Sequence, residues 1–380
     1  MLTQLELRSF KCFDILRLPL AQLTLLTGLN SAGKSSVLQA LVLLHQTMRE
    51  HEWSTRLALN GIGVRLGAVA DVVDEQSSST GFEIALEDQT NSYRWAFVGD
   101  RRDMSMQVQR VVFNDRMLEQ PKELRYLLPL RAPDSVESLA MRIRNLVYVT
   151  AERLAPQDSY VLEDPHVVTD VGPRGEHALS VLHWGRDDSV PDQLTLPDVS
   201  PLRLRQVEAR MGSLFPGFAI DLQQAPRATV VTLGLRTSEA EEFHRPVHTG
   251  FGLTQVLPVV VAALSAVKGD ILLIENPEVH LHPAGQAMMG QFTVDAARAG
   301  IQVIVETHSD HVLNGIRRAV KAGRLSAEQV AIHFFRPRSD EGPQVLSPVL
   351  DDTGNIDDWP DGFFDQFDKD ANYFAGWADV

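Results

Sequence analysis

The chain has 380 residues, of which 44% are hydrophobic and 22% charged, and its formal net charge at pH 7 is −15. This length can bury a large core and favours two lobes or domains, and the composition is that of a water-soluble globular protein. The acidic balance argues against broad, nonspecific binding to nucleic acid but leaves room for a local basic groove.

Signals for a compartment or a membrane are few. The chain has one cysteine, Cys12, which excludes an internal disulfide framework and suits a reducing cytoplasm. Its first residues show no basic segment followed by an apolar run, so we expect no signal peptide. The longest apolar run, residues 256–267, is interrupted by Pro258 and is too short to span a bilayer. We therefore expect a cytoplasmic protein without a membrane partner.

The first elements of the chain frame a phosphate-binding loop. Residues 5–13 alternate as a strand that ends in an aromatic and basic cluster, and residues 23–27 form an apolar, β-prone run. Residues 28–35 then read G-x-x-x-x-G-K-S, and residues 36–46 have the apolar spacing of a helix. This order of strand, glycine loop and helix predicts a P-loop nucleotide site.

Each part of this loop has a chemical task. Gly28 and Gly33 let the backbone turn its N–H groups toward the β- and γ-phosphates. Lys34 supplies a positive charge to the same oxygens, and Ser35 offers a hydroxyl to Mg²⁺. The residues expected to bind ATP here are Asn30, Ser31, Ala32, Gly33, Lys34, Ser35 and Ser36.

The middle of the chain carries a predicted sheet and a basic segment. Residues 82–86, 93–98 and 106–113 are expected to be strands of an antiparallel sheet. Residues 121–144 carry five basic residues, Lys122, Arg125, Arg131, Arg142 and Arg144. A solvated helical face is the default interpretation, and a nucleic-acid or partner surface is the alternative. Further predicted elements are a strand over 146–150, helices over 177–184 and 201–214, and two strands within 219–235.

Two later apolar strands end in candidate catalytic residues. Residues 270–275 run into Glu275, a carboxylate that a P-loop enzyme needs on the Mg²⁺ side of its site. Asn276 follows, where ABC-type ATPases usually carry a second acid that polarises the attacking water. The strand at 301–306 leads into His308, which resembles the histidine that senses the γ-phosphate in ABC-type ATPases.

A glycine-containing segment precedes the acidic strand. Gly250, Phe251 and Gly252 stand just before the apolar run at 256–267. In position they match the ABC signature, a helix N-terminus that meets the γ-phosphate bound by the other subunit. We expect these three residues to bind ATP across a homodimer interface.

A metal site is the alternative interpretation of the turn after Glu275. Glu278, His280 and His282 are residue types that bind metals. The same residues fall where ABC-type ATPases carry a dimer-contact loop, and no fourth ligand is evident. We therefore favour the dimer-contact loop.

A longer combination of motifs resembles one bacterial family. It comprises E-N-P-E-V-H-L-H-P at 275–283, E-T-H-S at 306–309 and W-P-D-G-F-F-D at 359–365, with A-E-R at 151–153 and G-F-G at 250–252. These motifs resemble the SMC/OLD-like, ABC-type AAA ATPases that end in a domain of unknown function marked by a W-P-x-G-F-F-D box. The resemblance covers nearly the whole chain. The two N-terminal strands likewise resemble the start of SMC and RecF heads.

The resemblance implies a fold and a division of the chain. The expected fold is an α/β P-loop NTPase of ABC/SMC-head type, with a mixed and antiparallel sheet lobe, a helical insertion and no long coiled coil. Residues 1–120 would form an ATPase lobe with the phosphate loop, and 121–240 an insertion. Residues 241–345 would form a second ATPase lobe with the signature, the acidic strand and the histidine, and 346–380 an acidic, aromatic tail.

The resemblance also implies an activity. ATP and Mg²⁺ would be bound, with Ser35 and Glu275 on the metal, and ATP would be hydrolysed to ADP and phosphate. OLD-type nucleases carry a Toprim region after the ATPase, and this sequence lacks one. We therefore expect an ATP-dependent homodimer that controls a separately encoded effector, such as a nuclease encoded nearby, in bacterial genome defence.

Three other functions were weighed against this one. A RecF-like repair ATPase that binds DNA directly is the main alternative. A transporter subunit is disfavoured by the divergent signature and by the lack of a membrane-coupling segment. A P-loop kinase would need neither the signature nor His308.

Asn276 predicts slow hydrolysis, because an amide cannot accept the proton of the attacking water. General-base positioning is typically worth about 10²–10⁴ in rate. Glu278 and Glu306 are the nearby carboxylates that could take this role, and the position of Glu278 on its loop favours Glu278.

The C-terminal tail combines acidic and aromatic residues. Aromatic side chains recur at near-helical spacing after Asp351, at Phe363, Phe364, Phe367, Phe374 and Trp377. The favoured interpretation is a helix that packs on its own C-terminal lobe, and docking to a partner is the alternative.

Overall fold

The computed structural model describes residues 1–130, 133–238, 240–339 and 342–375. Its centre is a six-stranded sheet in the order β16-β15-β3-β14-β13-β9, in which only the pairing of β16 with β15 is antiparallel. The strands are β3 (Leu23–Gly28), β9 (Val147–Val149), β13 (Ile271–Glu275), β14 (Gln302–Glu306), β15 (Val330–Phe335) and β16 (Val345–Leu346). Because β3, β14 and β13 are parallel neighbours, the phosphate loop, the His308 turn and Glu275 all follow strands at the same edge of the sheet.

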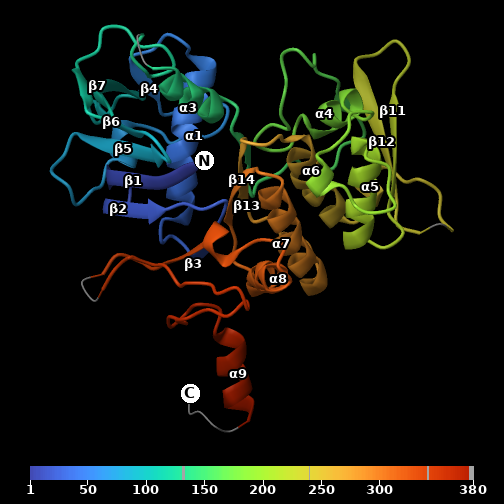
Figure 1. Ribbon diagram of the computed structural model, residues 1–380. Coiled ribbons are helices and arrows are strands. Elements are labelled where there is room, and N and C mark those ends of the chain that lie inside the picture. Colours follow the sequence, from blue (N-terminus) through green and yellow to red (C-terminus); the bar gives the residue numbers. More distant parts are fainter. Residues whose placement is uncertain (131–132, 239, 340–341, 376–380) are drawn as a thin grey trace.

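A second, antiparallel sheet forms the N-terminal side of the molecule (Figure 1). Its strands follow the order β2-β1-β5-β6-β7-β4, and β8 pairs with β7. They are β1 (Leu2–Phe10), β2 (Phe13–Pro19), β4 (Arg56–Ala58), β5 (Gly81–Asp88), β6 (Ser92–Val98), β7 (Ser105–Phe113) and β8 (Arg116–Glu119). The three strands predicted from alternating apolar residues at 82–113 are confirmed as β5, β6 and β7.

Helices cover these sheets, and a third, small sheet lies on the far side of the molecule from the N-terminal sheet (Figure 1). Its strands, in the order β10-β12-β11, are β10 (Tyr160–Val161), β11 (Ala219–Gln224) and β12 (Val230–Arg236). The α-helices are α1 (Lys34–Glu50), α2 (Val69–Val72), α3 (Asp134–Arg144), α4 (Ala178–Trp184), α5 (Arg203–Leu214), α6 (Phe251–Ser265), α7 (Pro283–Arg298), α8 (Asp310–Lys321) and α9 (Gln366–Phe374). Short 3₁₀ turns occur at Asp192–Leu194, Pro246–His248 and Ala327–Gln329.

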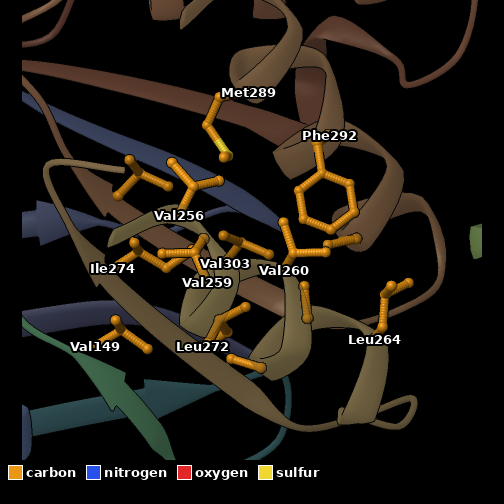
Figure 2. Packing of buried hydrophobic residues seen from close by; sticks show 14 of the residues in the cluster. Val149, Val256, Val259, Val260, Leu264, Leu272, Ile274, Met289, Phe292 and Val303 are labelled. Atoms are coloured by element: carbon orange, nitrogen blue, oxygen red, sulfur yellow. The ribbon is translucent and has the colours of Figure 1, made fainter. Parts of the chain in front are cut away.

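Helix α6 lies at the centre of the larger hydrophobic core. It is apolar on all sides, and every residue from Gly252 to Leu264 is buried. A helix that is apolar all round must be enclosed by other elements, and Figure 2 shows its valines among side chains of β9, β13, β14 and α7. The labelled residues are Val149, Val256, Val259, Val260, Leu264, Leu272, Ile274, Met289, Phe292 and Val303. This packing fixes the start of α6, and with it Gly250 and Phe251, relative to the catalytic strands.

The insertion predicted at residues 121–240 contributes a strand to the central sheet. The division into domains stays a prediction; within it, β9 belongs to the segment 121–240 but pairs with β13 in the central sheet. Among the helices that the structure describes, none is both long and apolar enough to cross a membrane.

The expected packing of the C-terminal helix on its own lobe is wrong for the residues described. Phe363 of the W-P-x-G-F-F-D box is fully buried, but Phe367 is 79% exposed and Phe374 83% exposed. Figure 1 shows α9 projecting from the body of the molecule. Trp377 lies outside the described residues. Helical spacing predicted the helix and its aromatic face, but it could not show whether another part of the chain covers that face.

Candidate phosphate and nucleotide site

The phosphate loop requires glycine at both of its turns. Gly28 has a φ of +131°, and a Cβ there would lie 2.1 Å from the backbone oxygen of Phe335. Gly33, with a φ of +104°, would place a Cβ 2.5 Å from the ring of Phe13 and 2.6 Å from Cys12 Sγ. Positive φ and this crowding exclude larger residues, so the backbone can lie close to a ligand.

Lys34 and Ser35 bond within the protein. Lys34 is 3% exposed, and its Nζ donates to the carbonyl oxygens of Gly28 at 3.1 Å and of Leu29 at 2.8 Å. Burial lowers the pKa of Lys34, while the charge of Glu306 opposes that change. Ser35 Oγ donates to Glu306 Oε1 at 3.0 Å. Both groups expected to meet phosphate and Mg²⁺ therefore have protein partners that a ligand would replace.

A cavity of about 390 Å³ opens over the loop. It is lined by Lys11, Cys12, Asn30, Ser31, Ala32, Gly33, Lys34, Ser35, Ser36, Gln39, Glu306 and His308. All seven P-loop residues expected to bind ATP are in this list, together with His308. The structure does not bring Glu275, Asn276, Glu278 or the 250–252 segment into the lining of this cavity.

Glu275 ends β13 beside Glu306 in register, but its carboxylate is already bonded. The hydroxyl of Tyr148 donates to Oε1 at 2.7 Å, and the backbone N–H of Ala151 donates to Oε2 at 3.1 Å. Burial and the Glu275 charge raise the pKa of Tyr148, which keeps it a donor. The strand β9 and the residues after it thus orient Glu275.

Arg153 holds the backbone after Glu275. The side chain is 5% exposed, and Nη2 donates to the carbonyl oxygens of Glu275 at 2.5 Å and Asn276 at 3.1 Å. Its Nε and Nη1 are buried without a hydrogen-bond partner. Burial lowers the pKa of Arg153 to about 10, and the charges of Glu278 and Glu275 oppose that change. Sequence reasoning noted the A-E-R motif but gave it no role.

Asn276 has a φ of +45°. Among residues other than glycine, this left-handed region is tolerated best by Asn, Asp and His. The backbone N–H of Asn276 donates to the carbonyl oxygen of Glu306 at 2.8 Å. The local backbone therefore gives one physical reason for an asparagine where ABC-type ATPases usually carry an acid.

Glu278 connects the turn after β13 to the turn after β14. Its Oε1 accepts from Thr307 Oγ1 at 2.7 Å and from the backbone N–H of His308 at 3.1 Å. Burial raises the pKa of Glu278, although the hydrogen bond from Thr307 opposes that change. Glu278 thereby positions His308, which reaches the cavity while Glu278 itself does not. Burial and the charge of Lys34 lower the pKa of His308, which favours the neutral imidazole near pH 7.

Glu306 is the carboxylate that faces the phosphate loop. It lines the cavity, and its Oε2 is buried without a hydrogen-bond partner. Burial raises the pKa of Glu306 to about 7, with the charge of Glu275 acting in the same direction. The hydrogen bond from Ser35 and the charge of Lys34 partly oppose this. The sequence analysis favoured Glu278 over Glu306 from the position of Glu278 on its loop. The bond between Ser35 and Glu306 spans 271 residues, so no local pattern reveals it.

The start of α6 lies against the turn that carries Glu278. Gly250 is the N-cap of α6, and Phe251 is 44% exposed with its ring 4.9 Å from that of His280. A Cβ at Gly252 would lie 2.8 Å from the carbonyl oxygen of His280, whereas one at Gly250 would have no neighbour within 4 Å. Gly250 and Phe251 thus present an open surface next to the turn formed by residues 276–282.

The donor set of this cavity suits a hard cation bound together with phosphate. No group of three or more His, Cys, Asp or Glu in the described ranges could hold a metal by itself. The hydroxyl of Ser35 in the cavity and the carboxylate of Glu275, which lies beside Glu306 on the neighbouring strand, are oxygen ligands of the type that Mg²⁺ prefers. Mg²⁺ usually takes one or two such ligands and completes its shell with water and substrate phosphates, so the residues fit this ion.

Comparison with known proteins agrees with this geometry. Residues 186–314 match the family model described as "AAA domain, putative AbiEii toxin, Type IV TA system". The fold matches a crystal structure of an Smc head bound to the C-winged helix domain of ScpA, with 16% identity, a TM-score of 0.56 and coverage of 92% of this chain and 98% of that one. The chain has the fold of an SMC head domain.

A second solved structure and a second family model also match this chain. A second match is an Smc head domain with an extended coiled coil, bound to the C-terminal domain of ScpA and derived from Pyrococcus furiosus. It shows 15% identity, a TM-score of 0.56 and coverage of 92% of this chain and 96% of that one. Residues 325–373 match the family described as "Protein of unknown function (DUF3696)". A search of curated proteins found no match.

Proposed function

We propose that this SMC-head-like chain binds ATP with Mg²⁺ and hydrolyses it slowly to ADP and phosphate. The observation that carries the proposal is the convergence of Lys34, Ser35, Glu306 and His308 on one cavity above the phosphate loop. Phosphoryl transfer needs stabilisation of negative charge and a proton acceptor. The backbone of the P-loop and Lys34 provide the first, and the carboxylate of Glu306 provides the second.

ATP binding begins with an exchange of hydrogen bonds. The backbone N–H groups of the loop point at the phosphates, and Lys34 leaves the carbonyls of Gly28 and Leu29 to contact the same oxygens. Ser35 releases Glu306 and turns its hydroxyl toward the metal position, with Glu275 as the carboxylate on that side. When bound, Mg²⁺ neutralises charge on the β- and γ-phosphates.

Glu306 is the group best placed to accept the proton of the attacking water. A general base works best when its pKa lies near the working pH, and the pKa of Glu306 is about 7. Glu278 is occupied with Thr307 and His308, and Asn276 cannot accept a proton. Because Asn276 stands where ABC-type ATPases usually carry an acid, and because Glu306 acts as the base without that neighbour, turnover is slow.

The functional assembly is a homodimer with ATP between the subunits. Gly250 and Phe251 lie outside the cavity of their own chain, and their surface is open. A helix N-terminus is a favourable contact for phosphate, so these residues can complete the site of a second copy. Because Phe251 contacts His280 and Glu278 holds His308, the dimer surface is connected by packing to the phosphate cavity.

We further propose that this dimer controls a separately encoded effector, in bacterial genome defence. The Smc heads of similar fold are solved with a domain of ScpA bound, and the matching AAA family is described as a putative toxin of a toxin–antitoxin system. Co-expression with the products of neighbouring genes tests this part. An effector whose activity is the same with and without ATP and this chain would refute it.

The ATPase proposal is tested by equilibrium nucleotide binding and phosphate release. Lys34→Ala is expected to abolish ATP binding, and Lys122→Ala, which removes an exposed lysine far from the loop in sequence, is the matched control. Ser35→Ala is expected to weaken binding only when Mg²⁺ is present. Unchanged ATP affinity in Lys34→Ala would refute the proposed site.

A further inference from the structure

Helix α9 carries an aromatic stripe that its own chain leaves in solvent. Phe367 and Phe374 are 79% and 83% exposed, and with Ala371 they stand at positions i, i+4 and i+7 of the helix. Asp370 lies on the same side of the helix, between the two phenylalanines. Two large rings on one face of an amphipathic helix form the pattern by which such helices enter apolar grooves.

The base of this helix is firmly attached to the body. Phe363 is fully buried, with its ring 5.4 Å from that of Phe334 and 5.1 Å from that of Trp359. Lys369 forms ion pairs with Asp361 at 2.7 Å and with Asp365 at 2.9 Å, which join the helix to the W-P-x-G-F-F-D box. The box therefore anchors α9 so that its aromatic stripe is presented outward.

A groove large enough for an aromatic ring lies beside α3. This α3 groove has a volume of about 170 Å³ and is lined by Arg125, Tyr126, Leu128, Pro129, Leu130, Glu137, Ala140, Met141 and Arg144. An apolar cavity of about 150 Å³ binds benzene, so the groove can hold one phenyl ring. Leu130 and Met141 are about half exposed at its edge, at 47% and 50%.

The α3 groove is lined by two arginines, Arg125 and Arg144, and by one carboxylate, Glu137. Arg144 stacks 4.1 Å from the ring centroid of Tyr126, and within the described ranges it forms no ion pair with a carboxylate. Arg125 also stacks on Tyr126, at 5.0 Å, and pairs with Glu52. Tyr126 and Leu127 both have left-handed φ values, +53° and +56°, a costly conformation for such residues that clusters at functional surfaces.

Charge favours a contact between these two surfaces. Residues 351–375 contain eight aspartates and one lysine, whereas residues 121–144 contain five basic and three acidic residues in an otherwise acidic chain. With a phenyl ring in the groove, Asp370 is placed to meet the unpaired Arg144 as an ion pair across an apolar contact. Figure 1 shows α9 and α3 at opposite ends of the molecule, so α9 cannot reach the groove of its own chain.

We propose that α9 of one molecule docks into the α3 groove of a second copy of this chain. Two different surfaces meet in such a contact, so repetition generates a ring or a filament. The contact uses neither the phosphate cavity nor Gly250 and Phe251. It therefore forms without nucleotide, and it can link ATP-dependent dimers to one another.

The test is light scattering of the purified full chain over a range of concentrations without nucleotide. We expect reversible, concentration-dependent assembly in the wild type. The double variant Phe367→Ala/Phe374→Ala should raise the midpoint concentration about tenfold or more, because buried aromatic anchors dominate interface energies. Phe243→Ala removes an exposed ring elsewhere and should leave assembly unchanged.

Charge exchange tests the pairing of the two surfaces. Arg144→Glu alone and Asp370→Arg alone should each weaken assembly. A mixture of the two proteins should restore it, because each groove then meets an arm of opposite charge. Asp358→Arg, on the same tail but outside α9, is the matched control. A wild type that stays monomeric at all concentrations, or a mixture that assembles no better than the single variants, would overturn the proposal.

Discussion

Replacing Glu306 by glutamine should make the protein more stable and much less active. Glutamine is the neutral counterpart of a protonated glutamate and can still accept the hydrogen bond from Ser35 Oγ. Burial raises the pKa of Glu306 from 4.5 to about 7, so the folded state binds this proton more tightly than the unfolded state does. The stability that this proton provides is lost as pH rises from 4.5 through 7.

The size of the effect follows from the rise in pKa. A change from 4.5 to about 7 corresponds to about 3 kcal/mol of stability lost by the wild type once the group is ionised. The glutamine variant avoids this loss, so it should exceed the wild type by about 2 kcal/mol at pH 6 and by about 3 kcal/mol at pH 8.5. At about 2.1 cal/mol/K per residue, 3 kcal/mol raises the melting temperature of a 380-residue chain by about 4 °C.

Thermal melts at the two pH values, with ATP turnover measured in parallel, provide the assay. Turnover should fall about 10²–10⁴-fold in Glu306→Gln if this group is the general base. Wild-type turnover should also rise with pH through about 7. Glu328→Gln, on an exposed surface, is the control. If Glu306→Gln melts no higher than the wild type at pH 8.5, Glu306 is readily ionised there and the reasoning about a poised base is wrong.

Three further changes examine the surroundings of the site. Gly250→Trp should prevent ATP-promoted dimerisation in light scattering while the monomer still binds ATP, since nothing in the described part of the chain lies within 4 Å of a Cβ at this position. Gly250→Ala is the control, and a dimer that persists in the Trp variant contradicts the model. Arg153→Met should lower the free energy of unfolding by about 1–3 kcal/mol, because it removes the buried donor to the carbonyl oxygens of Glu275 and Asn276. It also removes a positive charge near Glu278, so adding Glu278→Gln should recover part of the loss, and additive losses in denaturation would refute this coupling. Asn276→Glu should lower the free energy of unfolding by about 1–2 kcal/mol, because glutamate tolerates the left-handed φ of +45° poorly. Asn276→Asp should cost less, and equal melting temperatures for the two variants would argue against a left-handed residue 276.

Much of the fold and part of the site could be predicted because the signals are local. The phosphate loop is one continuous motif between a strand and a helix, and the apolar strands before Glu275 and His308 are short, uninterrupted runs. The SMC-head fold was expected from such motifs and is confirmed. A pattern within a few residues fixes both the element and the residue that ends it.

The rest depends on contacts between distant parts of the chain. Tyr148 and Arg153 reach the residues after β13 from more than 120 positions away, and Ser35 bonds to Glu306 across 271. Periodicity shows that α9 has an aromatic face, yet exposure of Phe367 depends on what the remaining chain leaves uncovered. Such contacts and exposures depend on the order of the strands in the sheet and on which elements cover one another. A short stretch of sequence predicts neither.

The hydrogen bonds that Lys34 and Ser35 make inside the protein limit the free energy that nucleotide binding can gain. Lys34 already satisfies two donors on the carbonyls of its own loop, and Ser35 already has a carboxylate acceptor. Nucleotide therefore replaces existing hydrogen bonds instead of adding new ones to free groups, and only the difference between the two sets contributes to affinity. With these carbonyls or with phosphate, the buried ammonium of Lys34 has oxygen acceptors, so the exchange of one set for the other leaves this charge compensated within the loop.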